Sequence, residues 1–109
     1  MANKYFTGEK DRYGNGYYDI IRICADMKSV VQGKKKMSKD LYEFWSMRFT
    51  IAHYNMVTWF NIYNGRWRLL GDEIRNGFRH CGDIRYTEDQ NRALDQLVLF
   101  LYAHDEDRV

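Results

Sequence analysis

Cysteine is scarce in this chain of 109 residues, which contains only Cys24 and Cys81. Two cysteines are too few for a disulfide framework, so we interpret both as core thiols of a protein from a reducing compartment. Long hydrophobic runs are also absent, because no apolar stretch reaches the roughly 20 residues that a membrane-spanning helix needs. The first six residues hold no apolar segment of the kind found in signal peptides. We therefore expect a cytoplasmic protein without a membrane partner.

Charge of one sign is not in large excess. The net charge is +2 at pH 7, far below the basic excess of a protein dedicated to nucleic acid. Aromatic residues, by contrast, make up 17% of the chain, and each buried ring removes roughly 150–250 Å² from water. A chain of this length with this apolar content predicts one domain around one core.

Helical periodicity begins after residue 16. Gly33 is a good C-cap for a first helix, and Ser38 is a good N-cap for the next one. The segment Thr87–Gln90 has the pattern of a capping box, which predicts a last helix that continues through an apolar stretch to residue 103. The apolar positions of the first helix recur at three- and four-residue steps and share one face: Ile20, Ile23, Cys24, Met27, Val30 and Val31.

The central run, residues 38–64, contains no Gly and no Pro. Read as one helix, it is apolar nearly all round and belongs in the middle of a bundle, with Asn64-Gly65 as its C-terminal stop. Read as strands, Asn64-Gly65 is a strong two-residue hairpin turn between residues 60–63 and 66–69. The helical interpretation is favoured, because the hairpin needs a third strand whose turn lacks Gly, Pro and Asp.

These patterns predict a mainly α fold, a compact bundle of about four helices over residues 17–104. Residues 1–16 are expected to form an irregular N-terminal arm, in which residues 4–7 fit a short edge strand. Residues 105–109 are expected to form an acidic tail. The alternative is an α+β fold with a hairpin turning at Asn64-Gly65.

Arginine and lysine are segregated along the chain, since every Lys lies at or before Lys39. Arginine forms planar contacts with carboxylate and phosphate groups, so the C-terminal half is better equipped to bind a shaped anion. On a helix, Arg68, Asp72, Arg75 and Arg79 share one face, a set that we call the Arg stripe. The alternative is a solvated face on which Asp72 pairs with the arginines around it.

Two further groups of residues extend this candidate site. Lys34, Lys35 and Lys36 precede the helix that starts at Ser38, and Arg66 lies beside the Arg stripe. Basic regions with aromatics between them are typical of single-stranded or nucleotide ligands. The aromatics proposed for stacking or for anchoring a partner are Tyr13, Tyr17, Tyr18, Tyr63 and Trp67.

Signals of catalysis and of metal binding are weak. The three histidines stand in no ligand motif, and we expect no metal and no cofactor. A Cys–His nucleophile pair, for example Cys24 with His53, is a remote alternative. We therefore expect a non-enzymatic binding protein for an anionic ligand: nucleic acid, a nucleotide or a nucleic-acid-handling complex. The main alternative is a protein–protein inhibitor or adaptor of the accessory or phage type. A homodimer through the apolar helix at residues 94–103 is also expected.

Overall fold

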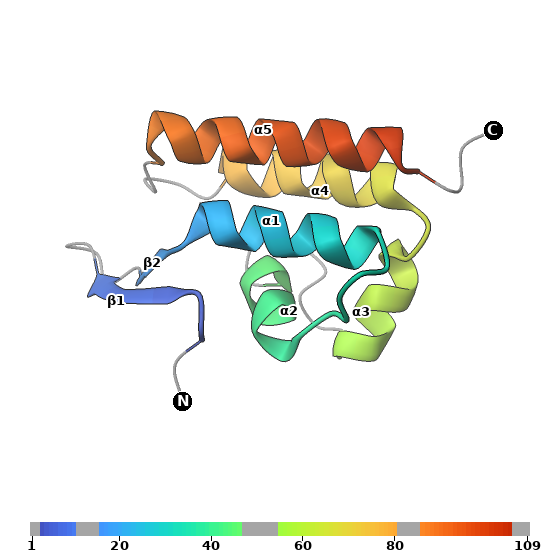
Figure 1. The fold of residues 1–109 in the computed structure, drawn as a ribbon, viewed down its shortest axis with the longest axis horizontal. Coiled ribbons are helices and arrows are strands. Elements are labelled where there is room, and N and C mark those ends of the chain that lie inside the picture. The colour runs from blue at the N-terminus through green and yellow to red at the C-terminus, as the bar shows by residue number, and fades with distance from the viewer. Residues whose placement is uncertain (1–2, 11–15, 47–54, 81–85, 106–109) are drawn as a thin grey trace.

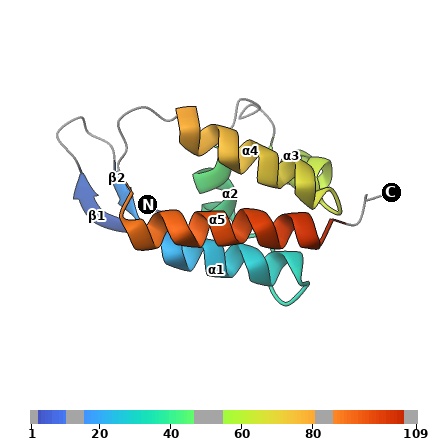
Figure 2. The same ribbon diagram turned by 90° about the horizontal axis from the view of Figure 1, so that it is seen from above.

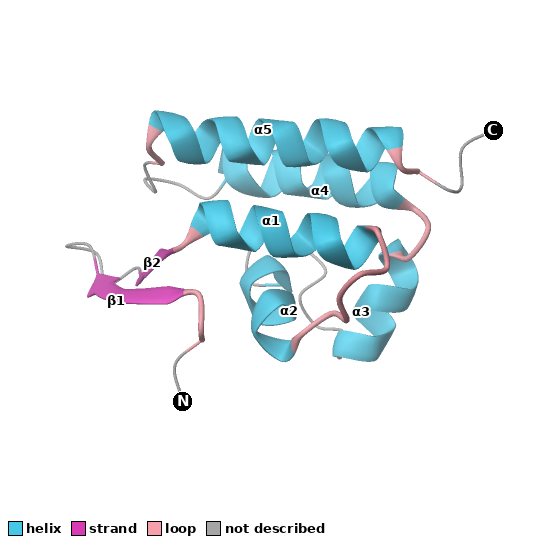
Figure 3. Cartoon of the chain, viewed as in Figure 1, coloured by secondary structure: helices cyan, strands magenta, loops and turns pink. Residues whose placement is uncertain are grey.

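Five helices and one pair of strands make up the part of the chain that the computed structural model describes, residues 3–10, 16–46, 55–80 and 86–105 (Figure 1, Figure 3). The mainly α fold predicted from the sequence is confirmed. None of these helices combines the length and the apolar character that crossing a membrane requires. In chain order the elements are β1 (Phe6–Lys10), β2 (Gly16–Tyr18), α1 (Ile20–Val31), α2 (Lys39–Ser46), α3 (Met56–Tyr63), α4 (Trp67–His80) and α5 (Glu88–Ala103).

Helix α5 packs against both α1 and α4. Seen from above, it lies between these two helices (Figure 2). Helices α2 and α3 lie on the other side of α1 and α4, and the strand pair stands at one end of the bundle (Figure 1). The core lies between these layers, and its largest fully buried side chains are Trp45, Trp59, Tyr5, Tyr63 and Phe44.

The ends of α1 and α5 form as the sequence predicts. Gly33 has a φ of +76°, and the N–H groups of Gly33 and Lys34 donate to the carbonyls of Val30 and Ser29 at 3.1 and 2.9 Å. These two bonds form a Schellman motif, which turns the chain sharply into the next segment. At the start of α5, Thr87 and Gln90 exchange side-chain to backbone hydrogen bonds at 2.9 and 3.1 Å, which confirms the capping box.

The central run is helical at both ends, but it is not one helix. Ser38 caps α2 as predicted, because its hydroxyl accepts from the N–H of Leu41 at 3.1 Å. A new helix then starts at residue 56, where the side chain of Asn55 accepts from the N–H of Thr58 at 2.9 Å. The backbone of Asn55 is extended (ψ 167°), so a continuous helix is wrong at this point. Residues 47–54 lie outside the described part.

The hairpin alternative is wrong. Gly65 has a φ of +78°, and the preceding residue, Asn64, is the C-cap of α3. The N–H of Arg66 donates to the carbonyl of Tyr63 at 2.8 Å. Helix α4 then begins at Trp67. Asn64-Gly65 therefore stops a helix and turns the chain into the next helix, because the buried Tyr63 and Trp67 hold the segments on both sides in the helical core.

The expectation of an irregular N-terminal arm needs correction. Strands β1 and β2 pair antiparallel, with Phe6 opposite Tyr18. Tyr5 attaches this pair to the bundle: its side chain is 1% exposed, and its carbonyl accepts from the N–H of Asp19 at 2.8 Å. Burial of this ring and the pairing of the strands give residues 6–10 and 16–18 a regular structure. The expected edge strand at residues 4–7 overlaps the start of β1, and residues 11–15, where the sequence indicates turns, lie outside the described part.

Gly71 explains how closely α4 and α5 approach each other. A Cβ at this position would lie 2.8 Å from Cε1 of Tyr102 and 3.6 Å from the carbonyl oxygen of Val98. A glycine inside a helix costs about 1 kcal/mol relative to alanine. Here that loss makes room for the ring of Tyr102.

Candidate ligand-binding site

A pocket of about 490 Å³ lies where the segment after α1 meets α3 and the start of α4. Its size falls within the range of roughly 300–1,000 Å³ that is usual for small-molecule sites. The pocket thus joins two parts of the chain that are remote in sequence, residues 30–37 and 56–67. Its described lining comprises Val30, Val31, Gly33, Lys35, Lys36, Met37, Met56, Val57, Phe60, Asn61, Asn64 and Trp67.

The wall on the α3 side is mainly apolar, with Asn61 and Asn64 as its polar members. The inner face of α3 buries Trp59 and Tyr63 in the core, so Val57 lies outside that contact, and Phe60 packs against the edge of the core while it lines the pocket. Val57 is 64% exposed. Trp67 closes the pocket from the core side, with its ring centroid 6.3 Å from that of Phe60. The indole N–H of Trp67 is buried and has no acceptor among the residues described.

The opposite wall is held by a partly buried ion pair. Lys35 forms an ion pair with Asp26 at 2.9 Å, and the hydroxyl of Tyr5 donates to the same carboxylate at 2.5 Å. Together with the Schellman turn at Gly33, this network fixes the loop after α1 beside the pocket. Lys35 therefore has a structural partner as well as a place in the lining.

Burial of Asp26 raises the pKa of its carboxyl, but the hydrogen bonds from Tyr5 and Lys35 and the charge of Lys35 outweigh burial and leave the pKa below its usual value. The same contact has the opposite effect on Tyr5, whose pKa is raised, first by burial and then by its hydrogen bond to Asp26. At neutral pH the Asp26 carboxylate is therefore ionised and the Tyr5 phenol is neutral.

The charge at the rim of the pocket is positive. Lys36 lines the pocket, is exposed, and has no ion-pair partner in the described part of the chain. No Asp or Glu occurs among the described lining residues. Lys34 is exposed next to Lys35 but does not belong to the lining. The arrangement is an apolar pocket with a cationic rim, which suits an anion that carries an apolar body.

The fold brings part of the predicted arginine group to the same end of the molecule. Arg66 is exposed and lies in the turn between Asn64 and Trp67, two residues that line the pocket. Sequence analysis placed Lys34–Lys36 and Arg66 in separate regions, and the pocket now links them. We call this group, Lys34–Lys36 with Arg66, the basic end.

The described side chains of the Arg stripe contact α5. Arg68 stacks over the ring of Tyr102 at 5.0 Å, and Asp72 accepts from the Tyr102 hydroxyl at 2.5 Å. Arg75 donates to the same hydroxyl at 3.4 Å. Hydrogen bonding to Tyr102 raises the pKa of Arg75, and the charges of Asp72 and Asp95 add to this shift. Asp72 and Asp95 therefore offset part of the positive charge of this face. The side chain of Arg79 lies outside the described part.

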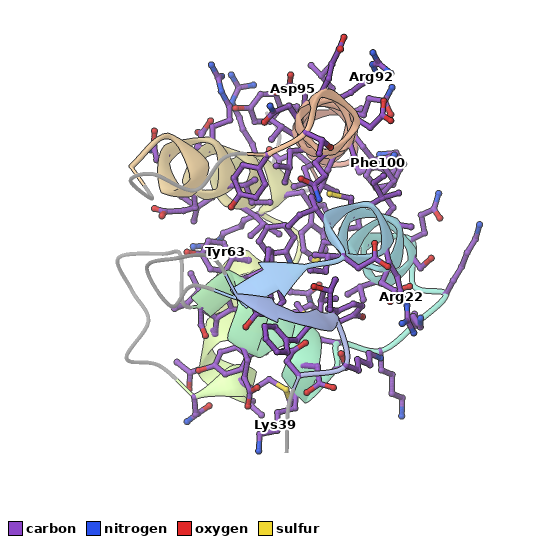
Figure 4. The ribbon with its side chains drawn as sticks, turned by 90° about the vertical axis from the view of Figure 1, so that its left-hand side faces the viewer. Arg22, Lys39, Tyr63, Arg92, Asp95 and Phe100 are labelled. Atoms are coloured by element: carbon purple, nitrogen blue, oxygen red, sulfur yellow. The ribbon has the colours of Figure 1, made fainter. Side chains whose placement is uncertain are left out.

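The predicted stacking aromatics do not form one surface. Tyr63 and Trp67 are 1% and 2% exposed, so a ligand cannot lie flat on either ring. Tyr18 is half-buried, and its ring packs against Phe44 with centroids 5.1 Å apart. Figure 4 shows Tyr63 inside the molecule, whereas Lys39 and Arg92 lie at its periphery. Tyr13 and the side chain of Tyr17 lie outside the described residues.

Cys24 is poorly suited to nucleophilic chemistry. Its side chain is 2% exposed, and burial raises the pKa of the thiol to about 12. Because the thiolate is the reactive form, a thiol buried in this way is a weak nucleophile, and the Cys24–His53 alternative stays an untested prediction. His53 lies outside the described part. Within that part, no group of three or more His, Cys, Asp or Glu side chains could hold a metal ion.

The apolar helix at residues 94–103 is used mostly within the chain. Its inward positions Leu94, Leu97, Val98 and Leu101 are buried, because α5 packs against both α1 and α4. Leu99 stays 66% exposed. The homodimer remains a prediction, with one large apolar side chain left to support it on the outer face of this helix.

Sequence analysis missed Met37, Met56, Val57 and Phe60 as pocket residues. Their apolar character was visible, but the positions of Met56 and Phe60 on a helical stripe indicated core packing. The break before α3 turns Met56, Val57 and Phe60 towards the loop after α1, which contains Met37. The one signal in the sequence was Asn55, an N-cap residue type three positions before Thr58.

Comparison with known proteins returns no relative. The chain matches no protein-family model, no curated protein and no solved structure. Its function must therefore be inferred from the geometry of the site.

Proposed function

We propose that this protein is a non-enzymatic binding protein that takes an anionic ligand at the basic end. The observation that carries the proposal is the pocket itself, which lies between the Lys35–Lys36 segment and the chain on both sides of Arg66. Two basic segments separated by thirty residues thereby line or flank one concave surface. Nucleic acid, a nucleotide and a smaller organic anion all fall within this proposal.

The support for the basic end is electrostatic. Lys36 has no acid partner within the described part of the chain, and the described lining of the pocket is free of acids. In a concave site with apolar walls, such a cation attracts an anion more strongly than it does on an open surface. The Arg stripe is less suited, because Asp72 lies between Arg68 and Arg75 and shares Tyr102 with them.

Charge reversal tests the proposal. The Lys36→Glu/Arg66→Glu variant should lose binding to three anionic probes: a single-stranded oligonucleotide, ATP and an alkyl carboxylate. The Lys39→Glu/Arg92→Glu variant changes the net charge by the same amount at positions outside the described lining of the pocket and should keep binding. Fluorescence anisotropy and titration calorimetry measure the affinities, and thermal unfolding checks that both variants fold.

Salt dependence provides a second readout for the oligonucleotide. With three phosphate contacts, counterion release weakens affinity about 20-fold between about 50 and 200 mM salt. If no probe binds in a manner that depends on Lys36 and Arg66, the proposal is wrong. Salt-insensitive binding of a protein through its apolar surface would instead support the inhibitor or adaptor alternative. If the Arg75→Glu variant loses binding and the Lys36→Glu/Arg66→Glu variant keeps it, the site is the Arg stripe instead.

A further inference from the structure

We infer that the ligand of the basic end is a small anionic amphiphile with a linear aliphatic body, which occupies the pocket and places its anionic head at Lys36. This inference rests on the proposed function and names the chemical class of the ligand. A carboxylate and a phosphate monoester share the required charge at the head.

The walls select the body of the ligand. Val31, Met37, Met56 and Val57 supply aliphatic and thioether surface on both sides of the pocket. Methionine adapts its shape to a flexible chain at little conformational cost. The only aromatic residues of the described lining are Phe60 and Trp67, and Trp67 is 2% exposed. The described lining therefore offers one partly exposed ring, that of Phe60, and no pair of rings between which a base could stack.

The polar groups of the described lining select the head of the ligand. This lining contains no carboxylate, and its side-chain amides are those of Asn61 and Asn64. Its cations are Lys35 and Lys36, and Lys35 is already paired with Asp26 at 2.9 Å. Lys36 is therefore the cation that is available to bind an anionic head, by a charge-assisted hydrogen bond.

The size of the pocket suits one small ligand molecule. About 490 Å³ is far too small for a folded partner and lies at the lower end of the usual range for small-molecule sites. Because burial of each methylene contributes a fixed increment, affinity should depend on chain length in a regular way. That regularity separates a ligand inside the pocket from an ion on the surface.

The experiment is a titration of the full chain with hexanoate, octanoate, decanoate, decyl phosphate and decanol, followed by calorimetry and by tryptophan fluorescence. Trp67 closes the pocket, so occupation should change its emission. The Kd for the carboxylates should fall about fourfold per added methylene until the pocket is full. Decanol should bind at least about tenfold more weakly than decanoate, because it lacks the charge. The two decyl anions show which head the site prefers.

Two matched pairs of variants locate the ligand. Lys36→Gln should weaken decanoate about tenfold, whereas Lys39→Gln, at a lysine 81% exposed outside the pocket, should not. Val57→Asp should weaken decanoate about tenfold by placing a charge beside the aliphatic chain. Leu99→Asp is its control, since Val57 and Leu99 are 64% and 66% exposed and only Val57 lines the pocket. Both test positions are on the surface, so the variants should fold.

The outcomes separate the two proposals. Saturable binding with the chain-length dependence and both variant effects supports the inference. Charge-dependent binding of the oligonucleotide or ATP, without binding of the amphiphiles, overturns the inference and leaves the proposed function intact. Affinity that does not depend on chain length, or equal losses in each matched pair, also overturns it. If no anionic probe binds, both proposals fail.

Discussion

Replacement of Gly71 by alanine tests whether the contact between α4 and α5 depends on this glycine. The added Cβ would lie 2.8 Å from Cε1 and 3.2 Å from Cδ1 of Tyr102. Contacts this short require the ring to move. The ring is held on its other sides, because Arg68 stacks over it and its hydroxyl donates to Asp72.

Two opposing terms determine the result. Helix propensity alone predicts that alanine stabilises α4 by about 1 kcal/mol. Overpacking in a fitted contact costs about 1–3 kcal/mol. With the middle of that range, Gly71→Ala should lower the free energy of unfolding by about 1 kcal/mol. The change is unfavourable although alanine is the best helix former.

A double-mutant cycle isolates the contact. Urea unfolding should be measured for the native chain, Gly71→Ala, Tyr102→Ala and the double variant. Without the ring, the alanine should stabilise the protein by about 1 kcal/mol, so the coupling between the two positions should be about 2 kcal/mol. Tyr102→Phe is the control, since it keeps the ring and removes the hydroxyl that contacts Asp72 and Arg75; in this background Gly71→Ala should still destabilise.

The reasoning is refuted if Gly71→Ala stabilises the native chain as much as it stabilises the Tyr102→Ala variant. The ring would then move aside at no cost, and the glycine would need another explanation.

Three further variants probe single interactions, each by urea unfolding. Asp26→Asn should lower the free energy of unfolding by about 2 kcal/mol at pH 7. Folding lowers the pKa of Asp26, so the contribution of this carboxylate is present above its unfolded pKa of about 3.9 and is lost as pH falls through its folded pKa. The difference between the variant and the native chain should therefore shrink in that range. A difference that does not vary with pH would contradict this assignment. Gly33→Ala should lower the free energy of unfolding by about 1 kcal/mol through backbone strain, because residue 33 has a φ of +76°. Gly33→Asn should cost less, and equal losses would argue against strain. Thr87→Ala should lower the free energy of unfolding by about 1 kcal/mol, because it removes the capping box. An unchanged stability would show that the cap is dispensable.

Contacts among near neighbours in the chain were predictable from the sequence. Ser38, Gly33 and the Thr87–Gln90 box occupy the positions that their residue types indicate. Such capping interactions join residues a few positions apart, so their geometry follows from local rules. The end of α3 at Asn64-Gly65 is a partial case, because the same two residues also favour a hairpin.

Contacts between remote segments were not predictable. Nothing near Tyr5 in the sequence indicates that its hydroxyl donates to Asp26, which lies 21 positions later, in α1. Periodicity placed Arg68, Asp72 and Arg75 on one face correctly, but it did not show that Tyr102 of α5 lies against that face. The helix-propensity cost of Gly71 was visible in the sequence. The room that this glycine leaves for the ring of Tyr102 is visible only in the structure.

The amino-acid sequence by itself determined the class of the protein: its apolar periodicity and its caps specify helices around one aromatic core, because these signals act within a few residues. Only the tertiary structure decided where the pocket lies. The break before α3 and the Asp26–Lys35 anchor bring Val57, Phe60 and Lys36 to one pocket. An apolar side chain has the same local pattern whether it faces the core or a cavity, so only the packing of the helices distinguishes the two.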